Sequence, residues 1–341
     1  MKKIIFSILA LVALSFSLTA CFPNKAPEPP IGSVAVVFPS DESNTHWKDE
    51  HSYLMQYLQT LNFATYYGLA PENDAKTQAE QIRYMKDHKV QFMIFCTVDA
   101  YSNEIASALE EYVSGGGKIL AFDRLQQNAL RIDALVSVSY KAIGALQYKA
   151  LEALPRGSKV EMISGPKYDN NASVLFDAAS ELVVDNIKME KWICPSGQKD
   201  YAKTKADSWS SDDAYRSMKS VLSAFYPNNT MPDAVLVSND AQAKGVINAL
   251  RDHNPTIGKF PIITGMNCDQ EALQNIMAGR QTMSINRNVI GYMKEVLDIV
   301  AAWAKGQQVE LPTRVVNQIG ATVPYKEVQD VTAIYAKDVI K

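Results

Sequence analysis

The chain has 341 residues, enough for about two domains of ordinary size. Apolar residues make up 47% and charged residues 21%, the balance of a folded globular protein, so the chain as a whole is not disordered. It carries 34 basic and 37 acidic residues, a net charge of -3, so no basic excess favours binding to nucleic acid.

The N-terminus predicts export. Two lysines precede an apolar run over residues 4–16, which is shorter than the ~20 residues a membrane-spanning helix needs. The Leu-Thr-Ala-Cys sequence ending at Cys21 resembles a bacterial lipobox. We therefore expect residues 1–20 to be a signal peptide removed before a lipidated Cys21, with the lipid as the chain's only membrane contact. An ordinary signal peptide with a chance cysteine is the alternative. Residues 21–30 contain four prolines and predict an extended tether.

From residue 31 the sequence alternates apolar runs with amphipathic stretches. The first part predicts strands over 33–38, 63–67, 92–96 and 118–122, and helices over 47–61, 75–86 and 103–113. Continuous apolar strands separated by helices are typical of a parallel sheet buried on both faces. The fold class is therefore α/β.

The pattern restarts after residue 138. It predicts helices over 141–154, 171–186, 212–224, 241–252, 270–278 and 289–304, and strands over 159–163, 189–194, 234–237, 260–264 and 281–285, followed by a mixed tail. One open doubly wound sheet of roughly ten strands is possible, but two sheets of five or six strands fit the length better.

Three cysteines follow Cys21 in the sequence, namely Cys96, Cys194 and Cys268. An odd number cannot pair fully, and no Cys-x-x-Cys spacing occurs. We expect three small buried residues; one disulfide with a spare thiol is the alternative, and the sequence does not say which cysteines would pair.

Polar residues gather directly after the predicted strands, where ligands bind in open α/β sheets. Asp41 and Asn44 follow the first strand, and the candidate ligand-binding residues are His46, Trp47, Asp123, Arg124, Asp169, Asn171, Trp209, Asn239, Asn267 and Arg287. Carboxylates and amides bond hydroxyls, guanidinium groups donate in a fixed fork, and indole faces cover the C–H face of a sugar ring. The set suits a neutral, hydroxyl-rich ligand.

Each of these residues also has a plain structural explanation. Asp169, Asn239 and Asp269 stand where helix caps are expected, and Trp209 can simply pack between lobes. The candidate residues contain no obvious pair of a nucleophile and a base, so they do not indicate an enzyme. The four histidines lack metal-binding spacing and no calcium loop occurs, so we expect no metal and no cofactor.

Together the motifs resemble the type I periplasmic sugar-binding proteins, in the branch of the xylose-, ribose- and glucose-binding receptors. The resemblance covers nearly all of residues 31–310. It is carried by the segments 118–124, 165–172, 208–209, 233–240 and 264–265. It implies two Rossmann-like lobes joined by three crossing segments, with sugar between them. Mapped here, one lobe comprises 31–137 and 288–316, and the other comprises 138–287 and 317–341.

Some positions depart from the family pattern. His46 stands before Trp47 where pentose-binding relatives have Arg, Asn267 stands where they carry Asp, and Arg287 stands where xylose-type relatives have Lys. Ser139 falls where ribose-type relatives often have an Asp. Replacing Asp by Asn removes a charged acceptor, so we expect a ligand other than xylose.

The resemblance implies a lipid-anchored solute-binding protein, and no enzyme, that captures a monosaccharide and delivers it to an ABC permease. Two alternatives stay open. The same fold can bind a nucleoside or signalling ligand and serve a chemoreceptor, or the chain is a surface lipoprotein whose cleft is vestigial and whose role is interaction.

Overall fold

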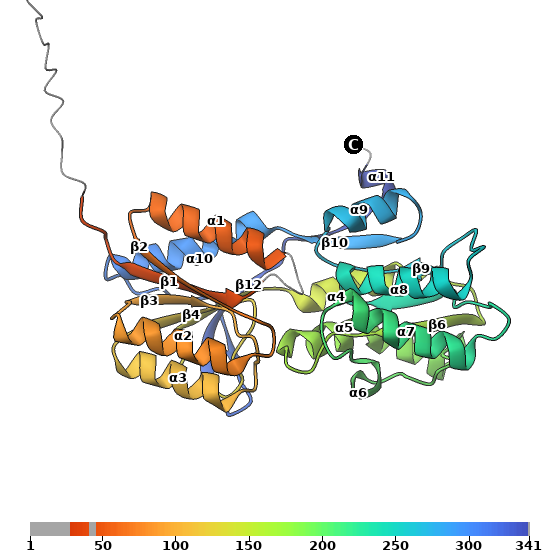
Figure 1. The fold of residues 1–341 in the computed structure, drawn as a ribbon, viewed down its shortest axis with the longest axis horizontal. Coiled ribbons are helices and arrows are strands. Elements are labelled where there is room, and N and C mark those ends of the chain that lie inside the picture. Colours follow the sequence, from red (N-terminus) through yellow and green to blue (C-terminus); the bar gives the residue numbers. More distant parts are fainter. Residues whose placement is uncertain (1–27, 41–45, 340–341) are drawn as a thin grey trace, which may run out of the picture.

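The chain folds into two lobes that lie side by side, as Figure 1 shows. This computed structural model describes residues 28–40 and 46–339. The predicted signal peptide, Cys21 and the tether up to residue 27 lie outside the described residues, as do Asp41 and Asn44. Among the helices of the described ranges, none is long and apolar enough to cross a bilayer.

The first lobe is built on a seven-stranded sheet. Its strands are β1 (Ser33–Pro39), β2 (Ala64–Ala70), β3 (Phe92–Phe95), β4 (Lys118–Phe122), β5 (Ala134–Val138), β11 (Thr313–Val316) and β12 (Thr322–Val328), in the order β11-β12-β5-β4-β3-β1-β2. All neighbours are parallel except β11 and β12, which form an antiparallel pair.

Helices cover both faces of this sheet, which explains why its central strands are continuously apolar. α1 (His46–Thr60) and α10 (Val289–Ala304) pack on one face through side chains such as Leu54 and Val300. α2 (Ala75–Asp87) and α3 (Asn103–Ser114) pack on the other through Ile82 and Leu109. The two pairs lie above and below the sheet in Figure 1.

The second lobe has a parallel four-stranded sheet in the order β7-β6-β8-β9 and a separate antiparallel pair of β10 and β13. The strands are β6 (Ser158–Ile163), β7 (Trp192–Ile193), β8 (Ala234–Val237), β9 (Ile262–Ile263), β10 (Met283–Arg287) and β13 (Val331–Tyr335). The helices are α4 (Tyr140–Lys149), α5 (Asn170–Lys188), α6 (Tyr201–Thr204), α7 (Ser211–Phe225), α8 (Asp240–His253), α9 (Gln270–Met277) and α11 (Ala336–Val339).

α4 and α5 pack closely together against one face of that sheet, and α7 and α8 against the other. Gly144 makes the first contact possible, because a Cβ there would lie 2.7 Å from the Cβ of Ala178. The α/β class with mainly parallel sheets is confirmed.

Three short segments cross between the lobes, after β5, after β10 and after β12. They are joined by hydrogen bonds: Ser139 N donates to Val328 O at 3.0 Å, and Asn288 N donates to Asp330 O at 3.1 Å. Segments of this kind, which join two lobes at the ends of secondary-structure elements, are where hinge motions of lobes occur.

The tail differs from the expected boundaries. The family resemblance places 317–341 in the second lobe, but β12 pairs with β5 inside the first sheet, with Tyr325 opposite Leu135. The third crossing therefore lies near residues 329–330 and not at 316–317. Pro324 explains why the sequence did not predict this strand, because proline lacks the backbone N–H that an internal strand uses.

The cysteines also depart from expectation. Cys96, Cys194 and Cys268 are all free within the described part of the chain. Cys96 is fully buried, but Cys194 and Cys268 are only partly buried, so the expectation of three core residues is wrong for those two. Both lie in loops after short strands rather than inside a sheet.

Candidate functional site

The candidate residues meet in a hollow between the two lobes, which we call the interlobe hollow. It is lined by His46, Trp47, Asp123, Arg124, Tyr140, Asp169, Trp209, Asn239, Met266, Asn267 and Arg287. Every candidate from the sequence except Asn171 is in this set. The hollow has a volume of about 10 Å³, which is about the room that one water needs.

Arg124 is the charged centre of the first-lobe wall. Its Nη1 and Nη2 donate to the Glu72 carboxylate at 2.7 and 2.9 Å. Its Nε lies 2.8 Å from Asp169 Oδ2 of the second lobe, a charge contact without hydrogen-bond alignment. The guanidinium also lies 5.1 Å from the Trp47 ring centre, and Trp47 Nε1 donates to Glu72 at 3.3 Å. Burial alone would lower the pKa of Arg124, but Asp169 and Glu72 raise it well above its usual value.

Arg287 is the corresponding cation at the end of β10. Its Nη2 donates to Glu50 Oε1 at 2.9 Å, and its Nη1 lies 3.7 Å from Asp123. His46 Nδ1 lies 3.2 Å from both Arg287 Nη2 and Glu50 Oε1. Burial raises the pKa of the Glu50 carboxyl, but His46 and Arg287 outweigh burial and hold that pKa below its ordinary value.

Asp123 stands directly after β4, with a φ of 64°. This left-handed conformation is one that Asp tolerates better than most residues, and it turns the carboxylate towards the second lobe. Tyr140, at the start of α4, donates its hydroxyl to the Asp123 oxygens at 2.9 and 3.0 Å. Burial and the Asp123 charge raise the pKa of Tyr140 well above its usual value, so its hydroxyl stays a donor.

Asp169 and Trp209 form the facing wall. Trp209 Nε1 donates to Asp169 Oδ2 at 3.0 Å, and Asp169 Oδ1 caps α5 by accepting from Asn171 N at 2.9 Å. Burial raises the pKa of Asp169 to about 6, although the Arg124 charge opposes this. Trp209 is buried against Tyr168 and Ala172, so it belongs to a small core as well as to the hollow.

Asn239 and Asn267 contribute the amides of the second lobe. Asn239 Oδ1 caps α8 by accepting from Gln242 N at 2.9 Å, so this side chain caps a helix and lines the hollow at once. Asn267 differs from every other amide in the wall, because its Oδ1 and Nδ2 are both buried without a hydrogen-bond partner. Arg287 Nε is also buried and unpartnered. Buried polar atoms of this kind are rare unless a ligand or water meets them.

Asn171 does not line the hollow. Its Nδ2 instead donates to the backbone oxygen of Asp123 at 2.9 Å, across the interface between the lobes. Two more hydrogen bonds cross nearby: Leu125 N donates to Asn170 Oδ1 at 3.2 Å, and Ala100 N donates to Tyr168 O at 2.8 Å. Asn171 therefore holds the lobes together in this closed arrangement, because the N-terminus of α5 points it at the first lobe.

Sequence reasoning missed Glu50, Glu72 and Tyr140. Glu72 follows β2, but that strand was expected to end at residue 67 and instead ends at Ala70. Tyr140 follows β5, which was not predicted. Glu50 is four residues after His46 on α1, a spacing that places the two on the same helix face.

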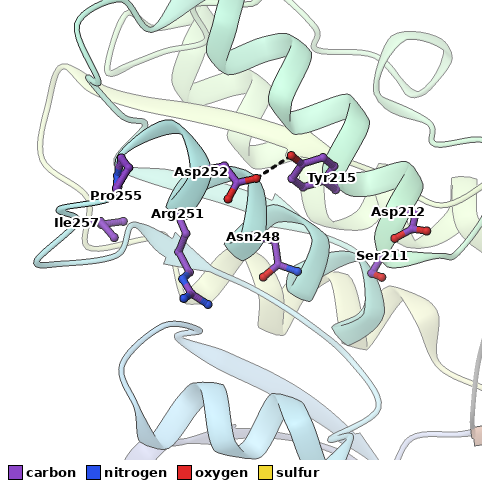
Figure 2. A pocket seen from close by; sticks show the side chains of 8 residues that line it. All are labelled: Ser211, Asp212, Tyr215, Asn248, Arg251, Asp252, Pro255 and Ile257. Carbon is purple, nitrogen blue, oxygen red and sulfur yellow. Dashed lines mark hydrogen bonds between the residues drawn. The ribbon is translucent and has the colours of Figure 1, made fainter.

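A larger cavity of about 720 Å³ lies elsewhere in the second lobe, between α7, α8 and the loop after α8 (Figure 2). Tyr215 donates to Asp252 there at 2.7 Å, and Asp212, Asn248 and Arg251 are exposed. Side chains that face bulk water do not converge on a ligand as those of the interlobe hollow do, so we place the site between the lobes.

Within residues 28–40 and 46–339, no cluster of three or more His, Cys, Asp or Glu side chains is arranged to hold a metal ion. The arrangement at the hollow instead offers fixed donors and acceptors on two facing walls.

Comparison with known sequences identifies the family. The family model described as periplasmic binding protein domain matches residues 34–308. The chain belongs to the periplasmic binding protein family. It is 26% identical over 315 residues to the multiple sugar-binding periplasmic receptor ChvE of Rhizobium radiobacter, covering 89% of this chain and 87% of that protein. It is 29% identical over 281 residues to the D-xylose-binding periplasmic protein of Escherichia coli K12, covering 80% and 78%.

Solved structures show the same fold. An ABC transporter solute-binding protein from Clostridium phytofermentans, solved with bound β-D-glucose, superposes with a TM-score of 0.83 at 24% identity. The match covers 89% of this chain and 94% of that one. A carbohydrate transporter solute-binding protein from Chloroflexus aurantiacus, in complex with D-glucose, gives a TM-score of 0.80 at 19% identity and covers 92% and 94%.

Proposed function

We propose that this protein captures a neutral monosaccharide between its lobes and delivers it to an ABC importer. The observation that carries the proposal is the interlobe hollow, where two indole rings, planar amides, carboxylates and guanidinium groups face one another. The buried, unpartnered amide of Asn267 offers one donor and one acceptor to a pair of hydroxyls. The names of the relatives, which bind several sugars, xylose or glucose, support the same ligand class.

The charges around the hollow favour a neutral ligand. Four carboxylates, from Glu50, Glu72, Asp123 and Asp169, are buried beside only two guanidinium groups. Both guanidinium groups are already paired with carboxylates. An acidic sugar or a sugar phosphate would bring a further negative charge into this low-dielectric site, where both guanidinium groups of the described lining are already engaged. A neutral polyol accepts and donates at the same atoms without that cost.

The small volume of the hollow supports a binding cycle in which the lobes separate. A space of about 10 Å³ does not admit a sugar ring, so the ligand enters only when the lobes move apart about the three crossings. Ligand that contacts both walls then shifts the population back towards closure. The closed pair of lobes would present one surface to the permease.

The lipid anchor is part of the same proposal. The lipobox-like sequence at Cys21 and the proline-rich stretch after it support an exported protein held at a membrane surface by lipid chains. Labelling with a radioactive fatty acid tests this, since a Cys21→Ser variant would lose the label if the thiol is lipidated.

A thermal-shift panel on the purified full chain tests ligand binding. The panel contains pentoses, hexoses, acidic sugars and nucleosides at millimolar concentration. A ligand at 100 times its dissociation constant adds about 2.7 kcal/mol of stability, which shifts the midpoint by several degrees. A shift with neutral monosaccharides and none with acidic sugars supports the proposal. A shift with nucleosides alone, or a flat panel, refutes it.

A further inference from the structure

A buried carboxylate lies behind the wall that carries Asn267. Asp240, the first residue of α8, is 3% exposed and does not line the interlobe hollow. Its Oδ1 accepts from Gln281 Nε2 at 2.8 Å. Its Oδ2 accepts from Ser284 Oγ at 2.8 Å and from Asp269 N at 3.1 Å. One carboxylate thus ties together α8, β10 and the start of α9.

The loop held by these bonds, residues 265–269, has an unusual backbone. Asn267 and Cys268 both have positive φ, at 110° and 57°, which costs energy for residues other than glycine. Gly265 packs directly on the carboxylate, because a Cβ there would lie 2.1 Å from Asp240 Oδ1. Surrounding bonds must therefore hold the loop in its shape.

Those bonds converge on Asp240 and Ser284. Asp240 N donates to Met266 O at 3.1 Å, and Ser284 Oγ accepts from Cys268 N at 3.0 Å. Asn267 N itself donates to Ile285 O at 2.9 Å. The backbone of Asn267 is thus fixed on both sides, while its side-chain amide stays unpartnered beside the hollow.

We propose that Asp240 is a positioning residue for ligand binding, because its carboxylate fixes the 265–269 loop so that Asn267 presents its amide to the ligand. This inference rests on the proposed function. It assigns a role to a side chain that does not touch the ligand. The ionised form is the one that holds the loop, since all three of its hydrogen-bond partners donate to it.

The surroundings of Asp240 place its titration close to neutral pH. Burial and repulsion from Asp269 raise its pKa to about 7, and the bonds from Ser284 and Gln281 oppose this. Cys268, in the same loop, faces it as a thiol whose pKa burial raises to about 12. His46 of α1 and Arg287 of β10 act on Asp269 as opposite charges. A proton on Asp240 turns an acceptor into a donor, so the loop is held less firmly as the pH falls from 8 to 6.

Two substitutions and one control test the proposal. Asp240→Asn keeps the size of the side chain and removes its charge, and Ser284→Ala removes one donor with less risk to folding. Glu161→Gln is the matched control: Glu161 is also buried in the second lobe and accepts from Tyr226 Oη at 2.9 Å, but neither residue lines the hollow. Isothermal titration calorimetry at pH 8 and pH 6 gives the dissociation constants. The titrants are D-glucose, D-xylose and the sugar that produces the largest thermal shift.

We expect both substitutions to raise the dissociation constant at pH 8 about tenfold, and the control to leave it unchanged. The unsubstituted chain should bind more weakly at pH 6 than at pH 8, and Asp240→Asn should show a smaller difference because it resembles the protonated form at every pH. The part that remains comes from Asp169, which lines the hollow and has a pKa of about 6. Circular dichroism and the melting midpoint check that each variant is folded.

The outcomes separate this inference from the proposed function. Absence of binding to every sugar by the unsubstituted chain overturns both. Binding by the unsubstituted chain with an unchanged constant in folded Ser284→Ala and Asp240→Asn overturns the positioning role alone. A pH dependence that persists in full in Asp240→Asn overturns it as well, whatever the affinity at pH 8.

Discussion

Replacing Arg124 by methionine tests whether the charge network between the lobes is a buried unit. Methionine keeps much of the length and the apolar stem of arginine but removes the guanidinium. The side chains of Glu72 and Asp169, 6% and 4% exposed, would then be left without the cation that they both contact.

The size of the effect follows from that burial. Breaking a buried ion pair by removing one partner costs about 3–5 kcal/mol, because the remaining charge stays out of water. Loss of the cation–π contact with Trp47 adds roughly 0.5–2 kcal/mol. At roughly 2–4 °C per kcal/mol for a lobe of this size, the melting midpoint should fall by at least about 6 °C.

Differential scanning calorimetry of the ligand-free chain measures this midpoint. Arg131→Met is the matched control, since Arg131 pairs with Asp133 at 3.0 Å while its own side chain is 61% exposed, and exposed pairs contribute little. Adding Glu72→Gln to Arg124→Met should restore part of the loss by removing an unpaired charge. The reasoning fails if Arg124→Met lowers the midpoint no more than Arg131→Met does.

Three further substitutions or conditions have defined outcomes. Asp123→Asn should lower sugar affinity about tenfold, because a hydrogen bond to a charged acceptor is worth about 1 kcal/mol more than one to a neutral acceptor. Asn also tolerates the left-handed backbone at that position, so the variant should fold; a variant that binds normally in calorimetric titration would show that the site is wrongly assigned. Asn171→Ala should weaken binding about five- to tenfold, since its bond to Asp123 O joins the lobes only when they are closed, and an unaltered dissociation constant would contradict that role. The Asp169 and Asp240 carboxyls have pKa values of about 6 and about 7 in the folded chain, against near 3.9 when unfolded. Between pH 4 and pH 7 the folded chain therefore binds more protons than the unfolded chain. The contribution of these two groups to the free energy of unfolding falls as the pH rises through this range. Urea unfolding measures the free energy of unfolding at pH 5 and pH 7.5, and the decrease between the two pH values should be smaller in Asp240→Asn than in the unsubstituted chain. An equal decrease in the two chains would argue against this contribution of Asp240.

Most of the fold could be predicted because its strands are short, apolar and flanked by amphipathic helices. The predicted helix over 289–304 matches α10 residue for residue, and the strand over 118–122 matches β4. Elements that depend on distant partners could not be predicted in this way. β5 and β12 pair with each other although they are about 190 residues apart, and no local pattern in the sequence predicts a pairing over that distance.

The sequence predicts those site residues that follow clearly marked strands, and it misses those that follow strands with unmarked ends. Asp123, Arg124 and Asn239 each follow a strand that the sequence marks clearly. Glu72 and Tyr140 follow strands whose ends the sequence does not mark. Asn171 shows a second limit. Its position in the sequence predicts the sheet edge near which it lies, but not whether its side chain faces the ligand or the opposite lobe.

The placement of β12 has a consequence for the order in which the chain can fold. The sheet of the second lobe is drawn from one contiguous stretch, 158–263, whereas the first sheet needs Tyr325 to reach Leu135 across more than half of the sequence. Pairings between such distant residues form slowly. During synthesis the second sheet can therefore assemble while the first still has β5 as an open edge, which is a template for pairing with other chains. Residues 322–328, which are made long after β5, thus protect the first lobe from association with neighbouring copies, and loss of β12 would expose that edge.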